Sequence, residues 1–159
     1  MHRRSFDKTD LKIGKKGEQQ FIDMMKKRCT NICHIENVDY KKYNYDVRIT
    51  FEREDGTKYD RTVEVKSLAG GHPTGVVEVW ANDAKTKRPH WFHKDVDMIA
   101  FQDRSCNKWF VYWAQPVIRY LKEQEGPFVR CNNNCEDSPG WMHKFVWDEM
   151  PGFLREVND

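Results

Sequence analysis

Two segments in which apolar and polar residues alternate flank the sequence Glu54-Asp55-Gly56, and this pattern strongly limits how this part of the chain can fold. Residues 43–52 and 57–66 alternate apolar and polar side chains, which is typical of strands with one buried face. A glycine after two acidic residues suits a three-residue hairpin loop, where it takes the left-handed conformation. We therefore predict an antiparallel hairpin in which Arg53 lies opposite Thr57.

This register brings charged residues together on one face of the hairpin. Asp46 faces Glu64, and Lys66 follows on the same face because side chains alternate along a strand. Directly opposed carboxylates destabilise a ladder by about 0.2–1 kcal/mol. Their alignment beside a lysine indicates a divalent-cation site, although a two-residue loop would shift the register by one. The alternative is a solvated face on which Arg48 and Lys66 balance the acids. The opposite face is a core face, formed by Val47, Ile49, Phe51, Val63 and Val65.

Apolar periodicity predicts the other elements. Residues 13–28 form an amphipathic helix, with Glu18 at the start of its apolar stripe. Residues 68–95 are less regular and include the turn-rich loop 69–75. The order predicts an α/β (α+β) domain with a central mixed β-sheet flanked by helices. The remaining strands are expected at 32–38, 76–80, 97–102 and 109–113, and a second helix at 116–123.

Length and charge limit the organisation of the chain. It has 159 residues, 33% of them charged, and a formal net charge of +2. We expect a single domain over residues 1–159, with its core at about 14–122 and an extension, 123–159, packed on it. The charge does not describe a strongly basic nucleic-acid coat, although clusters of basic residues permit a phosphate-binding face. No apolar run is long enough to span a membrane and no signal-peptide pattern opens the chain, so a cytoplasmic protein is expected.

The cysteines leave a second metal hypothesis open. Two widely separated pairs could form a structural zinc site, but each pair encloses three residues where the usual zinc knuckle encloses two. Reduced thiols, buried or partly exposed, are the alternative in an intracellular protein. The residues of the zinc hypothesis are Cys29, Cys33, Cys131 and Cys135.

The set formed by Glu18, Asp46 and Glu64-x-Lys66 resembles the PD-(D/E)xK nuclease superfamily, which has the restriction-endonuclease-like fold. The resemblance covers about residues 14–114 and includes the order of the elements. Tyr45 stands where the superfamily usually has a proline.

The part that follows Glu64-x-Lys66 is similar to small phage-type and Holliday-junction-resolvase-like members. The similarity lies in Thr74-Gly-Val-Val-Glu78 and in the segment from Pro89 to Phe101. Within that segment Val96-Asp97-Met98 is a loose match to the Ala-Asp-Tyr of those proteins.

The resemblance implies a metal-dependent endonuclease that hydrolyses DNA, duplex or branched, in recombination or repair, in a bacterial or phage-infected cell. Asp46 and Glu64 would bind Mg²⁺ or Mn²⁺, with the Val65 carbonyl and Glu78 as further ligands. Lys66 would orient or deprotonate the attacking water. Glu18 would complete the shell, or it only charges the start of its helix. A solvent-facing strand position explains Glu78 equally well.

Candidate DNA contacts are basic, imidazole and indole side chains. The alternative for the basic residues is a solvated surface, and for the histidine it is a position in an exposed loop. The tryptophan is instead expected in the core or in a dimer contact, so a homodimer is possible. A nuclease-fold module that binds nucleic acid or a partner without cutting, zinc-stabilised or not, is the alternative function. The candidate contacts are Lys15, Lys16, Lys85, Lys87, Arg88, His72 and Trp91.

Overall fold

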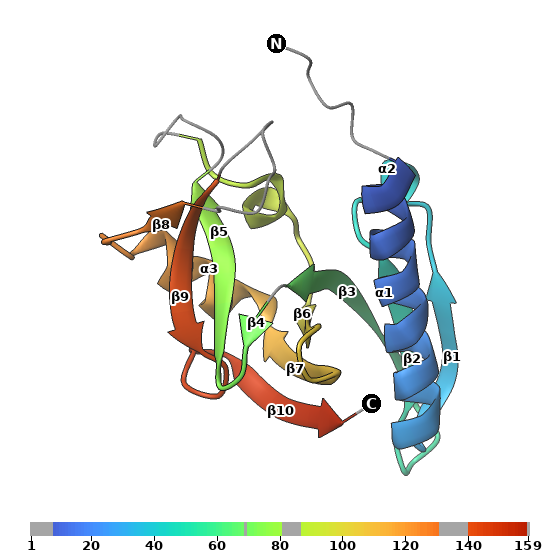
Figure 1. Ribbon diagram of the computed structural model, residues 1–159. Coiled ribbons are helices and arrows are strands. Elements are labelled where there is room, and N and C mark those ends of the chain that lie inside the picture. The colour runs from blue at the N-terminus through green and yellow to red at the C-terminus, as the bar shows by residue number, and fades with distance from the viewer. Residues whose placement is uncertain (1–7, 69, 81–86, 131–139, 159) are drawn as a thin grey trace.

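The computed structural model describes residues 8–68, 70–80, 87–130 and 140–158. The larger of its two described sheets has six strands, and Figure 1 shows how they are arranged. Their order is β1-β2-β3-β6-β7-β10, with β3 and β6 parallel and every other neighbouring pair antiparallel. The expected central mixed sheet is therefore confirmed. The strands are β1 (Ile32–Asn37), β2 (Val47–Glu52), β3 (Lys58–Leu68), β6 (Met98–Asp103), β7 (Lys108–Trp113) and β10 (Phe153–Asn158).

A second, antiparallel sheet packs beside the first and has the order β4-β5-β9-β8. The part of the chain after residue 122, expected as an extension packed on the core, supplies β10 to the central sheet and β9 to this one. The core therefore includes it. The strands of the second sheet are β4 (Gly70–Gly71), β5 (Thr74–Trp80), β8 (Val129–Arg130) and β9 (Trp141–Val146), and the helices are α1 (Lys8–Arg28), α2 (Tyr40–Tyr43), the 3₁₀ helix η1 (His90–His93) and α3 (Ala114–Lys122).

The β2–β3 hairpin has the predicted loop and register. Its ladder runs from Glu52↔Lys58 to Val47↔Val63. The Arg53 N–H donates to the Thr57 carbonyl at 2.8 Å, and Gly56 has a φ of 85°, which a glycine adopts without a Cβ clash. The regular ladder ends one pair before Asp46 and Glu64.

Two apolar layers cover the two faces of the central sheet. Helix α1 packs on one face through Phe21 and Met24, which meet Val47, Ile49 and Val63 of the hairpin. The other face packs against α3, η1 and the second sheet. Since Val63 lies on the α1 side, alternation turns Glu64 and Lys66 toward the layer that contains η1 and β5.

Strand β3 changes partner along its length. It pairs with β2 through residues 58–63 and with β6 through residues 63–68. Beyond Val63, no strand among the described residues pairs with the edge of β3 that faced β2. This open edge is where the predicted acidic residues lie.

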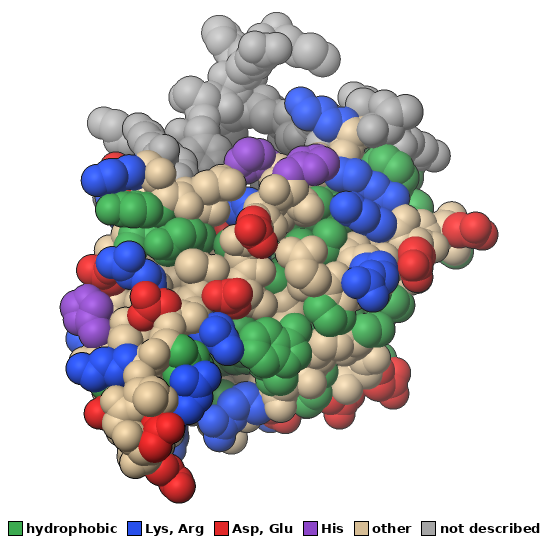
Figure 2. Space-filling model, turned by 180° about the vertical axis from the view of Figure 1, so that it is seen from behind, with side chains coloured by type: hydrophobic (Ala, Val, Ile, Leu, Met, Phe, Trp, Pro, Cys, Tyr) green, Lys and Arg blue, Asp and Glu red, His purple; other side chains and the backbone are tan. Residues whose placement is uncertain are grey.

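The surface carries charges of both signs. Figure 2 shows acidic side chains interspersed with basic ones across one face of the molecule. Across the described residues, the structure has no helix both long and apolar enough to cross a membrane.

Candidate active site

Asp46 and Glu64 form the centre of the site. Both are buried, with 9% and 4% of their surface exposed. The Val65 N–H, at the open edge of β3, donates to Asp46 Oδ2 at 2.9 Å. The Asp46 carboxylate thus occupies the place of the missing strand. Because the N–H and C=O of one strand residue point to the same side, the Val65 carbonyl also faces this edge.

The environment of the two carboxylates disfavours their charged forms. Burial raises the pKa of Asp46 from 3.8 to about 6, against the lowering effect of the Val65 N–H. Burial also raises the pKa of Glu64, and the neighbouring charge of Asp46 adds to that effect while Lys66 opposes it. Two buried, mutually repelling acids with raised pKa values are typical of sites that bind a cation or exchange protons.

Glu18 approaches Asp46 from α1, which covers the face of the central sheet opposite to η1 and β5. It is half-buried on α1, and its Oε2 accepts a hydrogen bond from Asn37 Nδ2 at 3.2 Å. Its charge and its side-chain hydrogen bond both raise the pKa of Asp46. The structure therefore brings Glu18, Asp46 and Glu64 to one end of the β2–β3 hairpin, as the sequence predicts.

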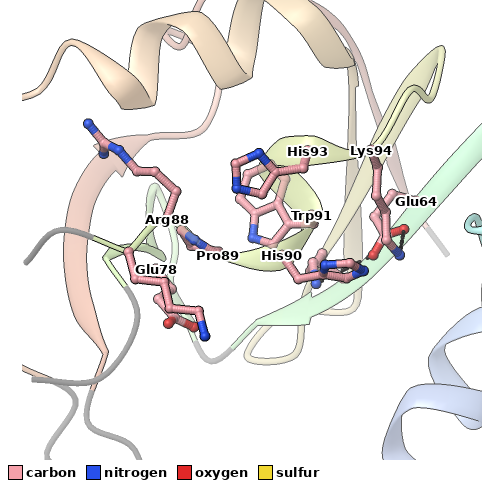
Figure 3. A pocket seen from close by; sticks show the side chains of 10 residues that line it. Glu64, Glu78, Arg88, Pro89, His90, Trp91, His93 and Lys94 are labelled. Atoms are coloured by element: carbon pink, nitrogen blue, oxygen red, sulfur yellow. Dashed lines mark hydrogen bonds and ion pairs between the residues drawn. The ribbon is translucent and has the colours of Figure 1, made fainter. Parts of the chain in front are cut away.

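Two lysines contact Glu64. Lys66 Nζ lies 3.4 Å from Glu64 Oε1, on the strand face predicted for it. Lys94 Nζ lies 2.7 Å from Glu64 Oε2 (Figure 3). Lys94 is 9% exposed, which is rare for a lysine. Sequence reasoning missed it, because the only signal is a lysine between buried Phe92 and Val96 in a stretch without clear periodicity.

A cavity of about 470 Å³ opens beside these lysines. Glu78 lies on the wall supplied by β5, where burial raises its pKa and the charge of Lys66 lowers it. Gly140 packs against it, since a Cβ there would lie 2.6 Å from Glu78 Cγ. Glu78 therefore faces Lys66 across the cavity. The cavity is lined by Glu64, Lys66, Glu78, Lys87, Arg88, Pro89, His90, Trp91, His93 and Lys94.

Arg88 has a different role from the one expected. Its guanidinium stacks on the Trp80 ring at 3.6 Å from the centroid, and it donates to the carbonyls of Val79 at 3.2 Å and Lys122 at 2.7 Å. These contacts tie the segment before η1 to β5 and to the end of α3. The expectation of an exposed phosphate contact is corrected accordingly. Lys87 is exposed at the cavity, and Lys85 lies outside the described residues.

Two other expected DNA contacts also take other positions. Trp91 is 5% exposed and packs edge-on against Phe92, so its ring is not available to stack on bases. Trp91 instead helps to position Lys66, whose Nζ lies 5.7 Å from the Trp91 ring centroid. His72 is 3.9 Å from Glu156 on β10, at the opposite edge of the central sheet, and does not join the site.

The remaining basic candidates lie on α1. Lys15 and Lys16 are exposed within one turn of Glu18. They therefore lie in the middle of α1, close to an acid of the site, where phosphate contacts are expected to be useful.

The zinc hypothesis stays a prediction. Cys29 is half-buried next to Met25, and the Cys33 thiol is exposed and donates to Glu52 Oε2 at 3.5 Å. Cys131 and Cys135 lie outside the described residues. Among the residues that are described, no three or more His, Cys, Asp or Glu side chains are arranged to hold a metal ion.

Comparisons with known proteins support the fold. No family model matches the sequence, and no curated protein matches it. Among solved structures, the chain is similar to a bacterial homing endonuclease, I-Ssp6803I, with a TM-score of 0.50 and 16% sequence identity over 88% of this chain and 79% of that one. At this identity the similarity shows the fold: the mixed α+β architecture is one that is also found in an endonuclease.

Proposed function

We propose that the protein is a metal-dependent endonuclease that hydrolyses DNA phosphodiester bonds at the Asp46–Glu64 site. The observation that carries this proposal is a pair of buried, mutually repelling carboxylates at an open strand edge with Lys66 beside them. The resemblance of these residues to the PD-(D/E)xK superfamily supports it, and so does a fold that is shared with an endonuclease.

The residues present fit Mg²⁺ or Mn²⁺. Proteins usually hold Mg²⁺ through one or two carboxylates, and water and substrate phosphate complete the octahedral shell. Asp46 and Glu64 supply the two carboxylates, and the Val65 carbonyl faces the same edge. A set of three close protein ligands is therefore not required.

Each residue has a role in phosphodiester hydrolysis. The bound cation supplies charge for the phosphoryl oxygens and lowers the pKa of a water molecule. Lys66 lies on the cavity side of Glu64, where it can orient that water or offset the charge of the transition state. Glu18, half-buried on α1, would complete the shell of the cation directly or through water. Glu78 acts on Lys66 from the opposite wall, or it holds a second cation.

DNA is the proposed substrate, duplex or branched. Because the segment from Pro89 to Phe101 is similar to that of Holliday-junction-resolvase-like proteins, we favour a structure-directed enzyme of recombination or repair, in a bacterial or phage-infected cell, with a homodimer as one arrangement.

The test is a cleavage assay with linear duplex, single-stranded, flapped and four-way DNA in Mg²⁺, Mn²⁺ or EDTA. We expect cleavage with either cation and none in EDTA. Asp46→Asn and Glu64→Gln should fold and lose at least about 100-fold in rate, because each removes a metal ligand. Glu54→Gln is the matched control, since it makes the same change at the exposed hairpin loop. A Glu64→Gln variant that cuts as fast as the parent would disprove the metal assignment.

A non-cutting nucleic-acid-binding module is the second candidate. It is favoured by one observation: Lys66 and Lys94 already neutralise Glu64 without a metal ion. DNA binding without cleavage under every cation would select this function. Stoichiometric zinc in the purified protein would add the zinc-stabilised form.

A further inference from the structure

Lys94 is the feature of the site that no sequence pattern explains. Its ammonium is buried and lies 2.7 Å from Glu64 Oε2, while Lys66 lies 3.4 Å from Oε1. Both oxygens of Glu64 are therefore in contact with a positive charge. Figure 3 shows Lys94 and Glu64 side by side at one end of the cavity.

A divalent cation on Glu64 conflicts with this arrangement. An oxygen ligand of Mg²⁺ lies about 2.1 Å from the ion, which would bring the doubly charged ion close to the Lys94 ammonium. Like charges repel strongly at such separations in a partly buried site. Lys94 also acts on Asp46, since its charge lowers the pKa of that carboxyl group. Lys94 and the cation therefore compete for the same acids.

The displaced ammonium needs another anion. The Lys94 backbone is fixed because its N–H donates to the Trp91 carbonyl at 3.2 Å. The four-carbon side chain can still turn, and it lines the cavity that Lys66 also lines. A buried charge without a partner is strongly unfavourable. A phosphate that enters the cavity would supply the missing negative charge.

This inference rests on the proposed function. We propose that Lys94 is a second catalytic lysine, which binds Glu64 in the metal-free protein and a non-bridging phosphate oxygen of the DNA when a divalent cation occupies Glu64. Lys66 remains the lysine on the side of the attacking water. Metal binding and phosphate recognition are coupled through Lys94.

The experiment measures three properties of the full chain for Lys94→Met and Lys94→Gln. They are Mn²⁺ affinity by calorimetry without DNA, melting temperature in EDTA, and the rate of DNA cleavage in saturating Mn²⁺. Lys94→Gln keeps a hydrogen-bond donor for Glu64, so it serves if the Met variant does not fold. Lys58→Met is the matched control, because it removes an exposed lysine at the opposite end of β3.

The expected effects have opposite signs. Both Lys94 variants should bind Mn²⁺ about tenfold more tightly because a competing positive charge is gone. They should cut DNA about 100-fold more slowly because a phosphate contact is lost. Their melting temperature in EDTA should fall, and Mn²⁺ should raise it by more than it raises that of the parent. Lys58→Met should keep the Mn²⁺ affinity of the parent.

Two results would separate the failures. If the parent neither binds Mn²⁺ nor cuts DNA, the proposed function is wrong, and this inference is wrong with it. If the parent does both while the Lys94 variants bind Mn²⁺ no more tightly, or cut as fast, the role of Lys94 alone is wrong. A purely structural role would weaken Mn²⁺ affinity and rate together.

Discussion

The Asp46 side chain accepts a hydrogen bond that a backbone carbonyl would accept if β2 were longer. The carboxylate accepts the Val65 N–H that a neighbouring strand would otherwise bind. This contact fixes the acid at the edge of β3 and keeps the edge from being an unsatisfied polar group. The position also leaves the acid buried next to two other carboxylates.

The pKa of Asp46 predicts how the stability of the metal-free protein depends on pH. Because this pKa is raised from 3.8 to about 6, the folded state favours the protonated acid. The stabilisation is complete below pH 3.8 and is lost as the pH rises through about 6. The free energy of unfolding should fall by up to roughly 3 kcal/mol across this window. Thermal or urea unfolding in EDTA measures it.

Asp46→Asn is the comparison for this prediction. Glu64 also has a raised pKa, so the informative quantity is the difference between the parent and the variant at each pH. The variant keeps an oxygen for the Val65 N–H but does not titrate. A difference that stays constant from pH 3.8 to 6 would show that Asp46 ionises normally.

At the scale of elements, the segment formed by residues 87–94 closes the site. Arg88 holds one end of it against Trp80 and the Lys122 carbonyl, and Lys94 holds the other end against Glu64. This segment forms one wall of the cavity, and the position of that wall therefore depends on contacts at both ends of the segment.

Arg88→Ala should destabilise the protein. It removes a cation–π contact and two hydrogen bonds to carbonyls, so a loss of about 1–3 kcal/mol is expected. Lys87→Ala removes the neighbouring charge, which is exposed, and should leave the melting temperature unchanged. Differential scanning calorimetry of both variants measures this. An Arg88→Ala variant as stable as the parent would return Arg88 to the DNA-contact candidates.

Sequence patterns predicted the hairpin well because its information is local. The glycine in the loop and the period of two determine which residues share a face with Glu64, and both lie within about twenty residues. Lys94 and Arg88 follow no such rule. Their partners, Glu64 and Lys122, are at least 30 residues away, so their roles depend on how η1 and α3 pack in three dimensions.

The predicted end of the core at residue 122 was wrong for the same reason, because sequence patterns carry mainly local information. The aromatics after residue 122 have no clear period, yet Phe145 and Trp147 are buried in the layer between the two sheets. The edge strand β10 joins the central sheet by pairing with β7, about 45 residues earlier in the chain. A pairing between such distant segments leaves no local signal that would have extended the core beyond residue 122.

At the scale of the whole molecule, a formal net charge of +2 cannot hold DNA by itself. The acids of the site also repel phosphate until a cation binds. DNA affinity should therefore be higher in Ca²⁺, which we expect to bind without supporting cleavage, than in EDTA. Fluorescence anisotropy with labelled duplex measures the two affinities. Equal affinities would mean that DNA does not approach Asp46 and Glu64.

The salt dependence of binding should locate the basic surface. Each phosphate neutralised contributes a log–log slope of roughly 0.9 for duplex DNA. Replacing Lys15, Lys16 and Lys87 by Ala together should weaken binding to all sequences and flatten that slope. Replacing Lys26 and Lys27, exposed in the last turn of α1, should have a smaller effect. If both sets flatten the slope equally, DNA binds elsewhere on the surface.

The parallel pairing of β3 with β6 has a consequence for the order in which the chain folds. The β2–β3 hairpin closes a short loop, whereas β6 reaches β3 only after some 35 residues have been ordered, as in the pair Val63↔Met98. We expect the hairpin to form in an early folding phase and β6, with the adjoining Lys94, to dock in a later one. During that interval the acids lack the buried ammonium. A divalent cation that binds them first should therefore slow the docking step, because it competes with Lys94 for Glu64.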